Sequence, residues 1–284
     1  MKEILVPTDF SACANNATQV ALDLAERFRG RLHLLTRIET PSHWPSPLAS
    51  ASSPVNPERE QRIHNAQVLL AEWQSRAQQR GVELRTHWAT GPLLPLIENY
   101  VAKQGIDFVV MGSHGASGKR DYLIGSNTQK VVRTLRHSVL IIKEDISDYV
   151  LRRVIFTSNF DAHEMPAFHY LLDLLRPFQP EIHLVQIDTA SWFSQPRVLV
   201  RDAMNDFEAA AEGFVCHQHF FRDWSVDAGI RNLSTSIDAQ LIGISNQYQH
   251  PLKRLLVGSN VEALVNHAQI PVLSIVVPET SASS

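Results

Sequence analysis

The chain has few of the features that mark specialised classes of protein. Its 284 residues include two cysteines, Cys13 and Cys216, which excludes a scaffold held by disulfides and fits a reducing cytoplasm. The net charge of −3 gives no excess of basic residues for binding nucleic acid. No apolar run approaches the roughly 18 residues of a membrane span, and a strand pattern begins almost at Met1. We therefore expect a cytoplasmic protein without a membrane segment or signal peptide.

Internal similarity divides the chain into two halves. Residues 124–142 align without gaps to residues 257–275, at a constant offset of 133. Residues 4–10 align to residues 154–160, at an offset of 150. Because two matching ends occur in the same order, the sequence indicates a tandem duplication. A length of 284 residues fits two domains of ordinary size.

The two expected domains span residues 1–146 and 151–280, and we expect them to pack as an intramolecular pseudo-dimer. Their closing apolar segments, Val139–Ile142 and Val272–Val277, are expected to pair or pack across the interface, while each domain keeps its own sheet. A homodimer of the whole chain is left open.

Within the first half, apolar runs alternate with amphipathic segments. Short runs rich in Val, Ile and Leu are typical of strands covered on both faces. Strands are expected at Glu3–Pro7, Leu32–Ile38, Glu83–Trp88, Asp107–Met111 and Ser138–Lys143. Helices are expected from the cap Ser11 to Gly30, over Glu58–Arg80, from Pro92, and from the cap Ser126. This alternation predicts an α/β fold with a doubly wound parallel sheet, whose ligand crevice lies outside the carboxyl ends of the strands.

A glycine motif follows the fourth expected strand. It reads Met111-Gly112-Ser113-His114-Gly115, and nine residues after Gly115 comes Gly125-Ser126-Asn127-Thr128 at the start of a helical pattern. Glycines let a backbone approach phosphate closely, and the N–H groups at a helix start attract negative charge. The spacing is neither G-x-G-x-x-G nor Walker A. Plain turn chemistry is the alternative interpretation.

The pattern Gly-x2-Gly-x9-Gly-Ser, with the opening and closing strands, resembles the universal stress protein family over nearly the whole chain. The resemblance implies two flavodoxin- or Rossmann-like domains in tandem, of the adenine nucleotide alpha hydrolase type. It also implies that the first half binds ATP, ADP or AMP, with Mg²⁺ as a further candidate ligand. The residues carried over to this site are Pro7, Thr8, Asp9, Arg37, Met111, Gly112, Ser113, His114, Gly115, Gly125, Ser126, Asn127 and Thr128.

In that family the glycine loop and the following Ser and Thr residues hold the phosphates, and the aspartate that ends the first strand contacts the nucleoside. Asp9 would take that second role, although an aspartate here is also a good helix-start residue. His114 is interpreted as pocket wall, because no triad-like partner stands near it. Arg37 replaces a small apolar residue that the family usually places against adenine. Arginine can stack on a base, pair with a phosphate or fill the pocket, so the base is left open.

The second half departs from the motif. Gly243-Ile244-Ser245-Asn246 aligns with Gly112-Ser113-His114-Gly115, so the second glycine is lost. In this alignment the distance from Gly243 to Gly258 is two residues longer than in the first half, and Asn159 replaces Asp9. We therefore expect that the second half does not bind ATP in the family manner.

Two further segments leave alternatives open. Residues 39–57 are rich in Pro and Ser, which favours a tolerated loop insertion over a lid. Cys216-His217-Gln218-His219, with His163, Glu164 and His169 elsewhere, raises the question of a metal site. Alternate residues of a strand supply at most two ligands locally, so a histidine-rich surface is the favoured interpretation.

The expected function is that of a nucleotide-responsive regulatory or protective module in a stress response. The motif offers a phosphate cradle but no evident general base or arginine finger, so we expect weak ATP hydrolysis at most. The alternatives are a slow ATPase or phosphotransferase and a nucleotide-free interaction scaffold. The expected partners are an adenine nucleotide and an unidentified protein, with no nucleic acid and no membrane.

Overall fold

The computed structural model describes residues 1–39, 57–114, 124–143, 149–189, 197–246 and 261–277. Its strands are β1 (Glu3–Thr8), β2 (Arg31–Ile38), β3 (Glu83–Thr90), β4 (Phe108–Gly112), β5 (Val139–Ile142), β6 (Arg153–Thr157), β7 (Glu181–Asp188), β8 (Cys216–Arg222), β9 (Leu241–Ser245) and β10 (Val272–Ile275). Its helices are α1 (Ala12–Phe28), α2 (Pro57–Gln79), α3 (Leu93–Gln104), α4 (Ser126–Thr134), α5 (Met165–Leu175), α6 (Arg197–Ala210) and α7 (Val226–Ser236), with a 3₁₀ turn, η1 (Ala162–Glu164). Residues 261–267 are also helical.

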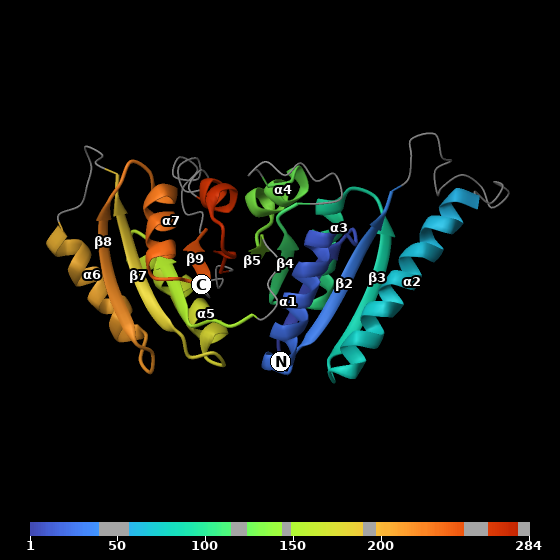
Figure 1. The fold of residues 1–284 in the computed structure, drawn as a ribbon, viewed down its shortest axis with the longest axis horizontal. Helices are drawn as coiled ribbons and strands as arrows, with labels where there is room; N and C mark the ends of the chain where they lie inside the picture. Colours follow the sequence, from blue (N-terminus) through green and yellow to red (C-terminus); the bar gives the residue numbers. More distant parts are fainter. Residues whose placement is uncertain (40–56, 115–123, 144–148, 190–196, 247–260, 278–284) are drawn as a thin grey trace, which may run out of the picture.

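The strands form one ten-stranded sheet in the order β3-β2-β1-β4-β5-β10-β9-β6-β7-β8, covered by helices on both faces (Figure 1). Within each half all neighbouring strands are parallel, which confirms the predicted α/β fold. One apolar core lies between the sheet and α1, α2, α5 and α6. A second lies on the other face, under α3, α4 and α7. None of the helices in the described ranges is long and apolar enough to cross a membrane.

The two halves join through their closing strands. β5 and β10 pair antiparallel, with Leu140 opposite Leu273, so a single sheet runs through both halves (Figure 1). The expectation that each half keeps a separate sheet is therefore wrong. Each closing strand would otherwise leave a row of unpaired backbone groups at an apolar edge, and pairing the two strands removes both edges.

The predicted helix ends are correct in part. The Ser11 hydroxyl accepts the Ala14 N–H at 3.3 Å and caps α1. At the other end of α1 the left-handed residue is Arg29, with φ 49°, and not Gly30. Gly30 is needed for another reason, because a Cβ there would lie 2.4 Å from the carbonyl oxygen of Lys2. In α4 the N-cap is Gly125, and Ser126 is the first helical residue.

Strand register corrects the alignment of the two halves. Phe108 lies opposite Ile4, and Leu241 lies opposite Val154. Ile4 and Val154 are equivalent in the repeat, so Phe108 is equivalent to Leu241, at the same offset of 133 that relates the later segments. The offset stays constant from the fourth strand of each half to its end.

The corrected register changes what replaces the glycines. Gly112 is equivalent to Ser245, not to Gly243, and Gly115 is equivalent to Tyr248. The inferred two-residue lengthening of the second loop is therefore wrong, since both segments have the same length. Both glycines are therefore replaced by larger residues in the second half.

Candidate functional site

A cavity of about 610 Å³ lies at the carboxyl ends of β1, β2 and β4. The start of α4 and the first half of α2 form its other walls. The predicted site residues that line it are Pro7, Thr8, Asp9, Arg37, Met111, Gly112, His114, Gly125, Ser126, Asn127 and Thr128. The topology thus brings together residues from both ends of the first half, as expected for parallel strands whose carboxyl ends share one edge.

The two remaining predicted residues are Gly115 and Ser113. Gly115 lies outside the described residues. The Ser113 side chain is buried, and its hydroxyl lies 2.8 Å from Nδ1 of His114. Ser113 therefore orients His114 and does not itself face the cavity. The Nε2 atom of His114 is buried and has no hydrogen-bond partner among the residues that the structure describes.

The end of β1 forms a tight turn into α1. The Thr8 hydroxyl accepts the Phe10 N–H at 3.0 Å, and Oδ1 of Asp9 accepts the Ser11 N–H at 3.0 Å. Phe10 takes a left-handed conformation, with φ 59°. Asp9 is exposed at the cavity wall while one of its oxygens holds the turn. The two interpretations of Asp9, helix start and ligand contact, are therefore compatible.

The start of α4 presents backbone donors at the cavity. The first intrahelical bond runs from the Gln129 N–H to the Gly125 carbonyl, at 3.0 Å. The N–H groups of Ser126, Asn127 and Thr128 precede it, so they have no partner within the helix. The cap residue Gly125 contributes no side-chain acceptor. Such a helix start favours an anion.

The Thr128 hydroxyl has a structural partner. It donates to the carbonyl oxygen of Gly112 at 2.9 Å in a buried contact, which ties α4 to the end of β4. This bond positions the helix start above the strand ends. Thr128 therefore holds the start of α4 in place, and its hydroxyl proton is already used.

Replacing Thr128 by valine is expected to lower the free energy of unfolding by about 1–3 kcal/mol, because a buried carbonyl loses its donor. Thr128→Ser keeps the hydroxyl and serves as the control. Urea unfolding of both variants measures the difference. Equal stability of Thr128→Val and the unmodified chain would show that this bond does not anchor α4.

Gly112 is required by packing. A Cβ at this position would lie 2.8 Å from the backbone carbonyl carbon and oxygen of Cys13, at the start of α1. In the second half the equivalent residue is Ser245, and α5 begins only at Met165, after the turn η1. In the second half, where this position carries a side chain, the α-helix thus begins later in the repeat than α1 does in the first half. Packing against the start of α1 is therefore enough to explain a glycine at position 112, which the sequence analysis had linked to close approach of a phosphate.

Charges of both signs line the cavity. Arg37 pairs with Glu39 across the end of β2. Arg62 of α2 also lines the cavity and donates to the Glu39 carbonyl at 3.4 Å. The Arg37 guanidinium is therefore held beside a carboxylate at the wall. It remains within the cavity lining, where a base or a phosphate would meet it.

Sequence reasoning missed about half of the lining. The missed residues are Phe10, Ala14, Thr36, Ile38, Glu39, Arg62, Asn65, Ala66, Leu69 and Leu93. The missed residues near β1 and β2 are adjacent in sequence to predicted positions, and this adjacency could have predicted that they line the cavity. Those of α2 carry no local signal, because only the tertiary fold places this helix over the strand ends.

In the second half aromatic packing accompanies the equivalent turn. Phe160, the equivalent of Phe10, is 2% exposed and packs edge-on against Phe207, with ring centres 5.1 Å apart. It also contacts Phe156, at 6.3 Å. Phe10 by contrast is only partly buried and lines the cavity. The space beside the second turn is thus occupied by side chains.

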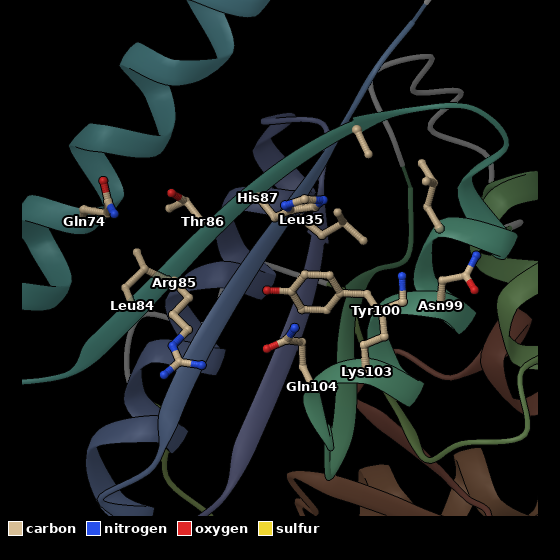
Figure 2. A pocket seen from close by; sticks show the side chains of 12 residues that line it. Leu35, Gln74, Leu84, Arg85, Thr86, His87, Asn99, Tyr100, Lys103 and Gln104 are labelled. Carbon is tan, nitrogen blue, oxygen red and sulfur yellow. The ribbon is translucent and has the colours of Figure 1, made fainter.

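A second cavity, of about 700 Å³, lies beside β3 and α3 in the first half. Figure 2 shows Arg85, His87 and Tyr100 along its wall. No predicted site residue lines it. Beneath it, Nδ1 of the buried His33 lies 2.9 Å from the Tyr100 hydroxyl.

The fold and the first cavity define a duplicated α/β protein with a crevice at the carboxyl ends of parallel strands. The model of the universal stress protein family matches residues 1–143 and again residues 151–275. The chain therefore belongs to the universal stress protein family, in a tandem arrangement.

The chain is also similar to a curated relative and to solved structures. The chain is 23% identical over 147 residues to a universal stress protein of Methanocaldococcus jannaschii, an alignment that covers 50% of this chain and 82% of the relative. It is similar to the crystal structure of a universal stress protein from Archaeoglobus fulgidus, with a TM-score of 0.74, 18% identity and coverage of 96% and 95%. A putative universal stress protein from Pseudomonas aeruginosa gives a TM-score of 0.68, 15% identity and coverage of 96% and 92%. These two structures show the shared fold alone.

Proposed function

We propose that this stress-response protein binds one molecule of ATP, or of a related adenine nucleotide, in its first half. The observation that carries the proposal is the uncapped start of α4, whose backbone donors line the same cavity as Asp9. Phosphates would accept from the N–H groups of Ser126, Asn127 and Thr128. The nucleoside would lie toward β1 and β2, between Asp9 and Arg37.

Mg²⁺ fits the donor set of the cavity. Carboxylate oxygens, phosphate oxygens and water are the ligands that this ion prefers. Asp9 supplies a carboxylate at the cavity wall. Bound Mg²⁺ would neutralise phosphate charge, while the protein would hold the nucleotide through the start of α4.

Slow hydrolysis of the bound nucleotide is a second candidate function. His114 lines the cavity, and no residue in the described part of the chain forms a hydrogen bond with its buried Nε2. A group of this kind can accept a proton or orient water. Turnover with Mg²⁺ that is lost in His114→Gln, with nucleotide affinity kept, supports this candidate. Absence of turnover in the unmodified chain removes it.

The proposed binding predicts a nucleotide that copurifies with the protein. Mass spectrometry of the supernatant after heat release is expected to detect an adenine nucleotide. If none is retained, titration of the protein with ATP and Mg²⁺ should still detect binding. A chain that neither retains nor binds adenine nucleotide is a nucleotide-free interaction scaffold, and that outcome refutes the proposal.

A further inference from the structure

Four side chains of the second half gather on one face of the sheet at β7 and β8. Glu181 and His183 come from β7, and His217 and His219 come from β8, which ends the ten-stranded sheet. His183 lies directly opposite His217 in the parallel register. Because alternate residues of a strand point to the same face, all four side chains share one side of the sheet.

Three of these side chains converge on one point. Nε2 of His183 lies 3.9 Å from Oε2 of Glu181, and Nε2 of His217 lies 3.7 Å from the same oxygen. The three atoms all lie within 4.8 Å of one another. Glu181 and His217 are about half exposed, so an ion can reach this point from solvent.

His183 is the buried member of the group. The residue is 5% exposed, and its Nε2 is a buried polar atom without a hydrogen-bond partner among the described residues. Burial, together with His219 and His217, lowers the pKa of His183 to about 4. An unpartnered buried nitrogen costs free energy that a bound ion would recover.

His219 is placed to hold His183 in the tautomer that such an ion needs. Nδ1 of His183 lies 2.8 Å from Nε2 of His219. When Nδ1 carries the proton and donates it to His219, the lone pair of His183 is on Nε2 and faces Glu181 and His217. Metal-binding histidines characteristically donate their second ring N–H to a neighbouring acceptor in this way.

The first half provides an internal comparison. His33 occupies the position equivalent to His183, and both of its nitrogens have partners: Tyr100 at 2.9 Å and Glu3 at 2.7 Å. The residue opposite His33 is Arg85, which lines the cavity of Figure 2, whereas the residue opposite His183 is His217. In the first half the histidine has hydrogen-bond partners on both nitrogens and lies opposite an arginine. In the second half the equivalent histidine has an unpartnered nitrogen and lies opposite another histidine.

We propose that Glu181, His183 and His217 form a binding site for a divalent transition-metal ion, with His219 as the residue that positions His183. Two imidazoles and one carboxylate suit zinc, with the remaining coordination open to water. The nearby cation Arg153 is paired with Asp238, which accepts from its guanidinium at 2.6 Å. The site does not depend on the proposed nucleotide cavity. It revises the sequence-based preference for a histidine-rich surface, because β7 supplies two ligands that strand spacing within β8 does not reveal.

Calorimetric titration of the metal-free full chain with zinc chloride tests the proposal. The unmodified chain is expected to bind one zinc ion at this site. His217→Ala and Glu181→Gln each remove an exposed ligand and are expected to lower the affinity at least about tenfold. His87→Ala is the matched control, because it removes an exposed histidine from β3, the edge strand of the first half. It should leave zinc binding unchanged.

Two further measurements separate the site from weak surface binding. Cobalt absorption spectra of the unmodified chain should show visible bands that both ligand variants lose, and zinc should raise its melting temperature but not theirs. Melting in EDTA establishes that the variants are folded. Absence of zinc binding, or equal binding by His217→Ala, Glu181→Gln and the unmodified chain, overturns the proposal. Zinc binding that persists without nucleotide binding leaves it standing.

Discussion

Replacing Asp9 by asparagine is expected to weaken adenine nucleotide binding by about 1–3 kcal/mol, or about 5- to 150-fold in affinity. Asparagine keeps the size of the side chain and an oxygen that can accept the Ser11 N–H, now bonded to Oδ1 of Asp9 at 3.0 Å. It removes the charge and one acceptor oxygen. The melting temperature should stay the same, because asparagine is as favourable as aspartate in such a turn. Affinity and melting are measured on the same preparation.

The reciprocal change, Asn159→Asp, is the matched control and should not create a second site. In the second half Ser245 and Tyr248 replace Gly112 and Gly115. Phe160 is also buried against aromatic neighbours beside the turn. A carboxylate alone therefore does not restore the cavity. Unchanged affinity in Asp9→Asn would mean that the end of β1 is scaffold, and that the site is limited to the glycine loop and α4.

Replacing Gly112 by alanine is expected to lower the free energy of unfolding by about 2–3 kcal/mol, the upper part of the range for overpacking. The new Cβ would lie 2.8 Å from backbone atoms of Cys13, which belong to a helix and cannot move aside singly. Because Gly112 also lines the cavity, displacement of α1 should weaken nucleotide binding as well. Urea unfolding and nucleotide titration measure the two effects.

Gly243→Ala is the control for that variant. A Cβ at Gly243 would meet a terminal methyl of Leu171 at 3.0 Å, and a flexible side chain can shift by a few tenths of an ångström. We expect a loss of less than about 1 kcal/mol there. If the two alanine variants lose equal stability, the contact with α1 is not what demands a glycine at position 112.

The sequence predicted the strands well because their signal is local. The runs of β1, β2 and β4 are buried on both faces, and those of β1 and β4 are also largely apolar, as expected for a covered parallel sheet. Asp9 and the start of α4 were placed at one crevice because the carboxyl ends of parallel strands meet at one edge. The cavity of about 610 Å³ lies at that edge.

The rest depends on contacts between distant segments. Aligning Gly243 with Gly112 by residue type gave a register that is two residues away from the one set by the pairing of β9 with β6. The antiparallel pairing of β5 with β10 depends on an edge that only the folded sheet exposes. The clustering of Glu181 and His183 with His217 required knowing that β7 and β8 are neighbours in that register. Residue types alone carried none of these facts.

The most direct measurement is calorimetric titration of the full chain with ATP in the presence of Mg²⁺. We predict a single site per chain, weakened in Asp9→Asn and unchanged in Asn159→Asp. Two equal sites would contradict the expectation that the second half does not bind adenine nucleotide. No binding, or binding that Asp9→Asn leaves unaltered in both affinity and stoichiometry, would contradict a nucleotide site built from the end of β1 and the start of α4.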